Sequence, residues 1–302
     1  MLRPYDPARD AADFLRLQNL ASGHGVSLEA FLKAEASWPA HHIQQRAVSE
    51  QGGAVVGTVG LRSFDYVPPN WLLLTLAVDP AARRQGLGSE LERWATAQAT
   101  ELRLDGLAAN VLDTDPASRA WAERRGFALH AHRFASELDL TKPYPAAELP
   151  PTLRLRDMTN ATEAEWNSLE ALYGDLLTHT PDLAGQPRWT PEALRLALRD
   201  SPRLRPEWLL LALDERGETV GLCHGAPIST GIYNEFTAVL PGARGKGLAR
   251  ILKLELIRRA QVAGVQRMRT NNHASNAPML RVNAALGFKA LAGSWELRRA
   301  LV

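Results

Sequence analysis

An internal repeat constrains this chain more than any other feature of its sequence. The segment Val78–Gly88 reads VDPAARRQGLG and the segment Val239–Ala249 reads VLPGARGKGLA, and each is followed by a Gly-Phe pair. The arginines of the two segments lie 161 residues apart (83 and 244), and so do the glycines of the two Gly-Phe pairs (126 and 287). The chain is 302 residues long, more than one ordinary domain needs, and we infer that one module has been duplicated.

Composition narrows the class of protein. Apolar residues make up 45% of the chain, which is enough for two cores, and 35 basic against 33 acidic side chains leave a formal charge of only +2. The sequence has no long basic run, so nucleic acid is not an expected partner. Because Cys223 is the single cysteine and no apolar signal or membrane segment is visible, we expect a cytoplasmic protein that does not enter a membrane. No metal site is predicted.

Prolines mark the boundary between the copies. Four of them lie within residues 143–151, where neither a helix nor a central strand is expected. We therefore predict a first domain at 1–142, a linker at 143–151 and a second domain at 152–302. In both domains, strands surround a long helix that follows the glycine turn, which predicts an α/β or α+β fold with helices on the faces of a sheet.

The glycine turn has the residues of an anion site. Small residues at Gly86 and Gly88, and at Gly247 and Ala249, let a ligand approach the backbone where a helix begins. The first amides of that helix have no acceptor within it, and the helix dipole adds positive charge. The alternative is a tight turn that binds nothing. A P-loop is excluded because no Gly-Lys-Ser/Thr follows, and a dinucleotide-binding turn is excluded because the third glycine is missing.

A short helix follows in each half and is punctuated at both ends. Asp115 precedes Pro116 and Asn276 precedes Ala277-Pro278, which predicts N-caps, and Gly126 and Gly287 are expected to close the two helices in the left-handed conformation. Capping alone explains both polar residues. For Asn276 a contact to a cofactor is the other interpretation, since an amide can donate and accept.

Taken in order, these motifs resemble the GNAT superfamily of acyl-CoA dependent N-acyltransferases. The likeness occurs twice, is strongest at 76–89 with 115–127 and at 237–250 with 276–288, and covers nearly the whole chain. Tandem members exist in that family, mycothiol synthase and its relatives among them. The resemblance implies two tandem domains, each with a mixed, mostly antiparallel sheet flanked by helices.

The resemblance also implies that the cofactor is acetyl-CoA. Two strand ends would run beside its pantetheine arm, namely Leu76, Ala77 and Val78 and, in the second copy, Thr237, Ala238 and Val239. The turns would hold its pyrophosphate through Arg83, Arg84, Gln85, Gly86, Leu87, Gly88 and Ser89 and through Arg244, Gly245, Lys246, Gly247, Leu248, Ala249 and Arg250.

The second copy has a candidate for the general base, the carboxylate that would remove a proton from the incoming amine. Members of the family often place a carboxylate on the strand before the turn, and Glu235 is in that place. A constant offset sets Leu74 opposite it, so the first copy lacks the acid unless Asp65 or Tyr66 replaces it. The tyrosine that many relatives use to protonate the thiolate is also missing, with Ala122 and Asn283 at its two positions. We expect Asn283 to donate a hydrogen bond there.

Several points stay open at this stage. Cys223 and His224 alternate along a strand, so we expect only one of them to face the site, and nothing marks the cysteine as a nucleophile. The predicted function is transfer of an acetyl group to a small-molecule or peptide amine. The alternatives are an acyl-CoA sensor without turnover and a purely structural role. The chain would be either a monomer whose two halves form a pseudo-dimer or a homodimer of two chains.

Overall fold

The structure, a computed structural model, describes residues 1–23, 25–39, 42–64, 67–183 and 188–301. The chain divides into two compact units. The first unit consists of residues 1–132 together with 292–302, and the second unit consists of residues 133–291. Each unit is described by itself below.

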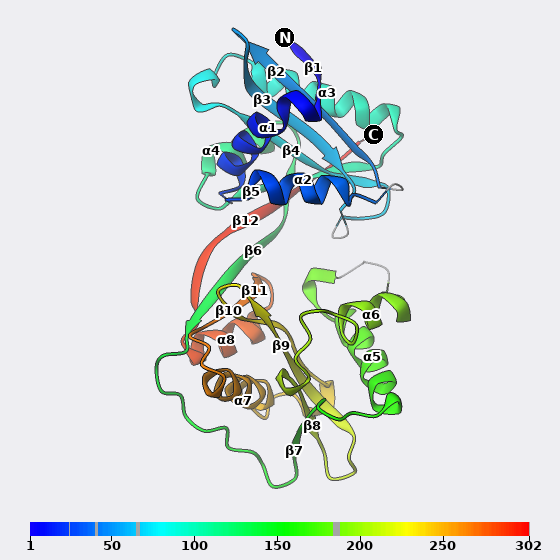
Figure 1. Cartoon of the computed structure of the whole chain (residues 1–302), viewed down its shortest axis with the longest axis vertical. Coiled ribbons are helices and arrows are strands. Elements are labelled where there is room, and N and C mark those ends of the chain that lie inside the picture. The colour runs from blue at the N-terminus through cyan, green and yellow to red at the C-terminus, as the bar shows by residue number, and fades with distance from the viewer. Residues whose placement is uncertain (24, 40–41, 65–66, 184–187, 302) are drawn as a thin grey trace. The chain divides into compact units, whose positions relative to one another are not determined.

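The first unit contains a sheet with helices on both faces (Figure 1). Its elements are, in chain order, β1 (Leu2–Pro4), α1 (Pro7–Ser22), α2 (Leu28–Ala36), β2 (Gln44–Gln51), β3 (Ala54–Arg62), β4 (Trp71–Val78), η1 (Pro80–Ala82), α3 (Leu87–Glu101), β5 (Gly106–Leu112), α4 (Pro116–Glu123), the start of β6 (Ala128–Asp139) and most of β12 (Lys289–Ala300).

The second unit repeats this order. Its elements are the remainder of β6, then β7 (Arg154–Asp157), α5 (Glu163–Leu177), η2 (Pro181–Leu183), α6 (Pro191–Ala197), η3 (Pro206–Trp208), β8 (Leu209–Leu213), β9 (Thr219–Ile228), β10 (Gly231–Val239), η4 (Pro241–Ala243), α7 (Leu248–Val262), β11 (Arg267–His273), α8 (Ala277–Leu286) and the start of β12.

In both units the sheet is mixed and mostly antiparallel, as predicted. The strand order is β1-β2-β3-β4-β5-β12 in the first unit and β7-β8-β9-β10-β11-β6 in the second. Only β4 with β5 and β10 with β11 pair in parallel within these two sheets, among the strands whose pairing is described. A parallel pair needs a crossover, and the long helices α3 and α7 provide it.

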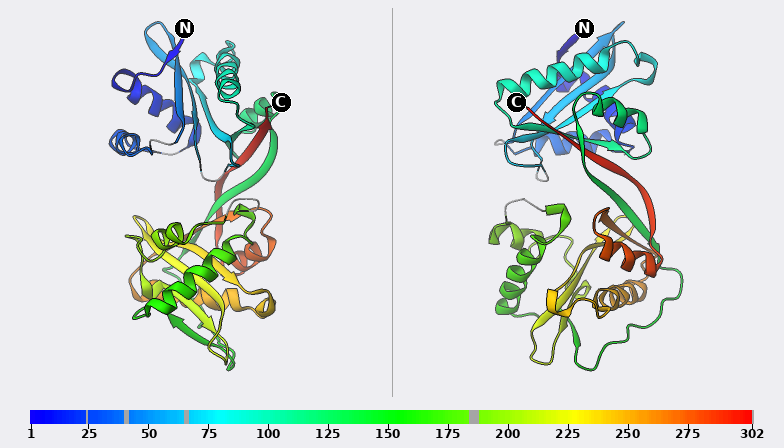
Figure 2. Two further views of the ribbon diagram at one scale, coloured as in Figure 1. Left: turned by 90° about the vertical axis from the view of Figure 1, so that its right-hand side faces the viewer. Right: turned by 180° about the vertical axis from the view of Figure 1, so that it is seen from behind.

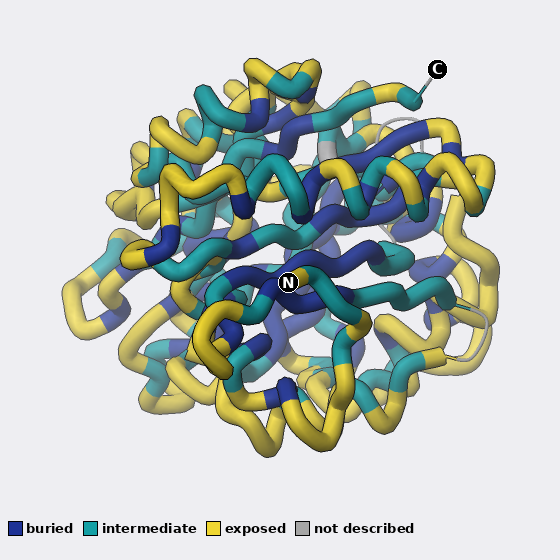
Figure 3. The backbone as a smooth tube through the Cα atoms, turned by 90° about the horizontal axis from the view of Figure 1, so that it is seen from above, coloured by how far each residue is buried: buried dark blue, intermediate teal, exposed yellow. Residues whose placement is uncertain are grey.

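Each sheet has a core on either side. In the first unit α3 and α4 cover one face and α1 the other, and in the second unit α7 and α8 face one way while α5 and α6 face the other (Figure 2). The strands are largely buried, and the outward turns of the helices are exposed (Figure 3). The two alternating faces of β9 therefore look into different cores, which matters for the site below.

The closing strands are exchanged between the two halves of the sequence. Residues 294–300 of β12 pair with β5 in the first unit, and residues 133–139 of β6 pair with β11 in the second. Leu297 is buried in the core of the first unit, and Leu138 in that of the second. The structural division thus differs from the predicted domains, since 133–142 belong to the second unit and 292–302 to the first.

The proline-rich segment does not separate the units. It is free of helix and strand, as its prolines require, but residues 143–151 lie within the second unit. Gln261 of α7 donates to the carbonyls of Leu140 and Lys142 at its start, at 2.7 and 2.8 Å. The segment therefore connects β6 to β7 along the second unit.

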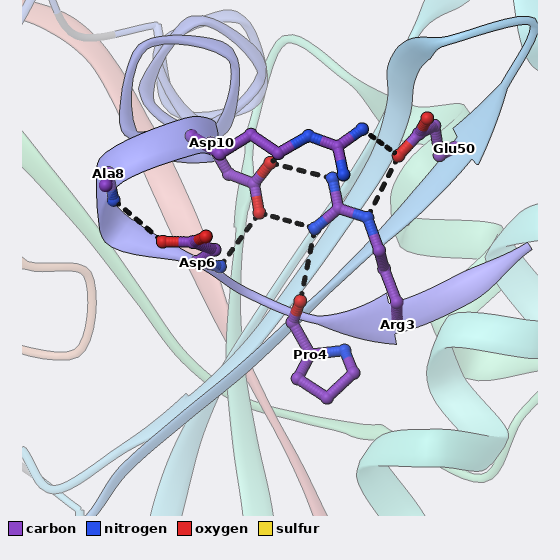
Figure 4. A network of polar contacts seen from close by, with 7 residues as sticks. Arg3, Pro4, Asp6, Ala8, Asp10 and Glu50 are labelled. Atoms are coloured by element: carbon purple, nitrogen blue, oxygen red, sulfur yellow. Dashed lines mark hydrogen bonds and ion pairs between the residues drawn. The ribbon is translucent and has the colours of Figure 1, made fainter.

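A buried ion pair fastens the start of the chain to the first unit (Figure 4). Arg3 of β1 donates to both carboxylate oxygens of Asp10 at 2.6 and 2.8 Å and to Glu50 of β2 at 2.9 Å. Asp10 is 1% exposed, and its pKa is lowered mainly by the bond to Arg3. The bidentate geometry joins α1 to the edge of the sheet.

Across the described residues, no helix has the length and apolarity that crossing a membrane requires.

Candidate active site

Both glycine turns have the geometry of an anion site. Gly86 and Gly247 have φ of +85° and +77° and immediately precede α3 and α7. A Cβ atom added at either position would meet nothing within 4 Å, so the backbone there is open. Among the described residues, the amides of 84–88 and of 245–249 have no hydrogen-bond acceptor, which leaves them available to a ligand.

The arginine that the two repeats share has a structural role in the turn. Arg83 donates from Nε to the carbonyl of Val78 at 3.1 Å, and Arg244 donates likewise to Val239 at 2.9 Å. Each side chain thus ties the turn back to the end of the strand before it. Its terminal guanidinium nitrogens still add positive charge beside the open amides.

The packing of α4 also requires a small residue at Gly88. A Cβ atom at Gly88 would lie 3.2 Å from the ring of Trp121 on α4, so the glycine makes room for this indole. Arg125 lies over the same indole, 3.9 Å from its centroid, and donates to Ser89. The start of α3 is therefore held by α4 in the first unit.

The strands that lead into the turns part from their parallel neighbours. The pairing of β4 with β5 ends at Leu74 although β4 continues to Val78, and the pairing of β10 with β11 ends at Tyr233 although β10 continues to Val239. Beyond these points no ladder pairing with the parallel neighbour is found among the described residues, although Thr270 of β11 still donates to the carbonyl of Asn234 at 3.0 Å. The strand ends predicted to contact pantetheine, 76–78 and 237–239, lie there.

One residue is added to β10 relative to β4. Leu72 pairs with Leu107 in the first unit and Ile232 pairs with Met268 in the second. The offset is therefore 161 residues between β5 and β11 (107 and 268) but 160 between β4 and β10 (72 and 232). At the ends of the two strands the offset is 161 again (78 and 239).

The added residue is Glu235. The ladder between β9 and β10 shifts between Asn234 and Phe236, which leaves Glu235 in a β-bulge, whereas the ladder between β3 and β4 keeps one register throughout. Leu74 therefore corresponds to Asn234. The prediction that Leu74 stands opposite Glu235 was wrong, because a constant offset does not hold across a bulge, and Glu235 has no counterpart in β4.

Glu235 is partly buried and pairs with a cationic side chain. Its side chain is 23% exposed, and Oε1 accepts a hydrogen bond from Nη2 of Arg203 at 2.5 Å. Burial raises the pKa of Glu235, and Arg203 opposes this with its charge and hydrogen bond. A carboxylate with a raised pKa beside an open strand edge has the properties of a general base. The loop that carries Arg203 shows no motif, so the sequence did not identify this partner.

His224 of β9 and Phe236 of β10 lie on the same face of the sheet, where Tyr173 of α5 packs against both. The Tyr173 hydroxyl is 3.4 Å from Nδ1 of His224, and the Tyr173 and Phe236 rings are 4.8 Å apart. Burial lowers the pKa of His224 to about 4, so the imidazole is neutral near pH 7. Nε2 of His224 is buried and has no partner among the described residues. Cys223 faces the other core, and burial raises the pKa of its thiol, as expected for a cysteine that is not a nucleophile.

The remaining predicted residues are in the α7–α8 part of the second unit. Asn276 caps α8 by accepting from the amide of Met279 at 3.4 Å, and Gly287 ends that helix at φ +89°. Asn283 is 3% exposed, and its Nδ2 donates to Asn272 at 2.8 Å, so this amide already has an interior acceptor.

Asp65 and Tyr66 were the residues that could replace the missing acid of the first copy. Both lie outside the described residues. Across the described part of the chain, no group of three or more His, Cys, Asp or Glu side chains is arranged to hold a metal ion.

Comparison with known proteins agrees with the repeat. The model of the acetyltransferase (GNAT) family matches residues 13–127 and again residues 166–288. A mycothiol acetyltransferase of Salinispora arenicola is 32% identical over 220 residues, which cover 71% of this chain and 66% of that protein. The chain thus spans just under two thirds of the length of this relative.

Two solved structures share the architecture. A GCN5-related N-acetyltransferase from Sphaerobacter thermophilus superposes with a TM-score of 0.74 at 21% identity and covers 99% of this chain and 95% of its own. A tandem GNAT protein from the clavulanic acid biosynthesis pathway gives a TM-score of 0.68 at 21% identity, with 99% and 98% covered. At this level of identity the likeness shows the fold, with its two repeated halves.

Proposed function

The chain belongs to the GNAT family of acetyltransferases, and from that premise we propose that its second unit transfers an acetyl group from acetyl-CoA to a primary amine, with Glu235 as general base. The observation that carries the proposal is the position of Glu235, which stands on a bulge of β10 beside the edge from which β11 has parted. In the first unit, β4 has neither the bulge nor the acid.

The second unit has groups that fit the cofactor. The amides of 245–249 would hold the pyrophosphate, with Arg244 and Lys246 adding positive charge, and the free edge of 237–239 would lie beside the pantetheine arm. When bound, acetyl-CoA would supply the thioester whose acetyl group the amine accepts, with the C–S bond breaking and CoA leaving as a thiolate that takes a proton from water. An amide on this edge is suited to donate to the carbonyl oxygen as negative charge develops there.

Glu235 would take the proton that the amine loses. An amine arrives protonated near neutral pH, and attack requires its lone pair, so a carboxylate must accept a proton at Oε1 or Oε2. Burial raises the pKa of Glu235 and makes it a better acceptor than an exposed carboxylate. Arg203 keeps the side chain charged and oriented in the absence of an amine.

The name of one relative indicates which amine to test first as the acceptor. The name mycothiol acetyltransferase makes mycothiol without its acetyl group the first acceptor to test. The decisive assay mixes the protein with acetyl-CoA and a panel of amines and follows loss of the acetyl-CoA thioester, a signal that a thiol-bearing acceptor does not mask. The proposal fails if acetyl-CoA binds but no amine, the unacetylated mycothiol included, gives product.

A narrower role fits the first unit. Its turn has the same open amides at 84–88, but β4 has one register and Leu74 is buried in the core. Binding of acetyl-CoA without turnover is therefore the second candidate function, confined to this unit. Calorimetry that finds two sites in the wild type and one in a Gly86→Glu variant would support it.

A further inference from the structure

The bulge that carries Glu235 is closed by a side chain of its own strand. Asn234 is 2% exposed, and its Nδ2 donates to the carbonyl of His224 at 3.0 Å and to that of Phe236 at 3.2 Å. His224 and Phe236 are the first ladder partners after the register shift. The amide of Asn234 therefore bonds main-chain acceptors on both strands at the irregular point, where the ladder is disrupted.

A buried lysine holds that amide in place. Nζ of Lys253, on α7, donates to Oδ1 of Asn234, and the hydroxyl of Thr237 donates to the same oxygen at 3.1 Å. With its carbonyl oxygen engaged twice, Asn234 can only present its NH2 group to the bulge. Lys253 is 1% exposed and lies 5.4 Å from the ring centroid of Phe288. Burial lowers the pKa of Lys253 to about 8, so placing an ammonium here costs free energy.

The contacts also show how the bulge redirects side chains. Asn234 and Thr237 are three residues apart, yet both face the core of α7, where they contact Cys223. In a regular strand such residues would point to opposite faces. The added residue instead places Phe236 against Tyr173 on the α5 side, where burial, with a smaller contribution from the charge of Glu235, raises the pKa of Tyr173.

The first unit lacks every part of this arrangement. Leu74 occupies the position of Asn234, and the counterpart of Lys253 is Glu92. Glu92 accepts from Arg299 at 2.6 Å and from Thr96 at 2.9 Å, both away from β4. The bulge and the Asn-Lys contact thus occur together in one unit and are absent together from the other, among the described residues.

We propose that Asn234 and Lys253 are positioning residues that form a clamp, fix the bulge of β10 and so hold Glu235 toward the acceptor amine. The inference rests on the proposed function, because the placement of Glu235 matters only if Glu235 is the base. Neither residue touches the reacting atoms. Their effect is on the orientation of a carboxylate, and a small misplacement of a catalytic group lowers kcat while leaving the affinity for acetyl-CoA unchanged.

The test uses two substitutions in the full chain. Asn234→Asp keeps an acceptor for Lys253 but removes both amide donors from the bulge, and Lys253→Met removes the ammonium while retaining much of the side-chain volume. Each is expected to lower kcat about 10-fold to 100-fold with KM for acetyl-CoA nearly unchanged. The matched control is Thr58→Val, which removes the buried acceptor of Gln18 in the first unit and should leave kcat unchanged.

A second background separates positioning from general damage. If the clamp acts through Glu235, Asn234→Asp should cause little further loss of kcat in a Glu235→Gln protein, because residues that act as one unit are not additive. Thermal unfolding of every variant checks that it is folded. An equal loss in both backgrounds, or full kcat in both clamp variants, overturns the clamp alone. Full kcat in Glu235→Gln overturns the proposed base, and the clamp with it.

Discussion

The two units share a glycine turn with the geometry of an anion site and differ by one residue in the strand before it. Both turns open a helix with unpaired amides and a glycine in the left-handed conformation, and both tie an arginine back to the strand end. Only β10 contains the extra residue, and that residue is the acid. The comparison suggests that binding of the cofactor and removal of the amine proton are separable, since the parts for the first can be present without the parts for the second.

The cores beneath β4 and β10 also differ, in the partner of a buried cationic side chain. In the first unit Arg299 from β12 lies 4.7 Å from the ring centroid of Phe127 and pairs with Glu92. In the second unit Lys253 from α7 lies beside the equivalent Phe288, and its partner is the strand residue Asn234. The cation stabilises the closing strand in one unit and the bulge in the other.

The strongest test of this comparison is removal of the acid. Glu235→Gln is expected to lower kcat about 1000-fold, because a positioned general base contributes roughly two to four orders of magnitude. Single-turnover measurements of thiol release would show it. Glu255→Gln, on α7 of the same unit, is the control and should keep the activity. Wild-type kcat in Glu235→Gln would show that the base is elsewhere.

The exchanged strand can be tested by its ion pair. Arg299→Leu leaves Glu92, which is 8% exposed, without its cation, and a broken buried pair costs about 3 kcal/mol of unfolding free energy. Hydrogen exchange should then rise in β5 and α3 of the first unit. Arg258→Leu, which removes an exposed partner of Glu255, should cost less than about 1 kcal/mol. Faster exchange in the second unit alone would contradict the strand exchange.

A matched pair of glycine substitutions asks which turn serves catalysis. Gly247→Glu and Gly86→Glu impose the same left-handed strain, about 1–2 kcal/mol, and each adds a negative charge where a pyrophosphate would bind. We expect KM for acetyl-CoA to rise about 10-fold in Gly247→Glu and to stay near the wild-type value in Gly86→Glu. Steady-state kinetics decides, and the reverse result would mean that the first unit is the catalytic one.

The smallest effect concerns the pH dependence of the second unit. Arg203 lowers the pKa of Glu235 against the effect of burial, so Arg203→Gln should raise that pKa further. Since the base works when deprotonated, the acidic limb of kcat/KM should move to higher pH, and activity below that limb should fall. Arg205→Gln changes an exposed neighbour and should leave the profile in place. A limb that moves to lower pH would show that Glu235 does not produce it.

Local signals in the sequence were sufficient for the turns, the caps and the family. Glycines with positive φ, an Asp or Asn before a proline and a repeated spacing are fixed by short-range sterics and hydrogen bonds, and the structure has them at Gly86, Gly247, Asp115 and Asn276. The presence of an acid in one copy only was also legible, although its register was not.

Only the tertiary structure decided the rest. A bulge changes which face a residue takes without leaving a distinctive local pattern, so Glu235 was matched to Leu74 until the ladders were compared. The exchange of β6 and β12 depends on pairing between strands far apart in the chain, and Arg203 reaches Glu235 from a loop. Sequence by itself determined which secondary structure each segment forms and which family the chain belongs to. Long-range packing determined which segments complete each unit and what surrounds the acid, because those contacts join residues whose local patterns are independent of one another.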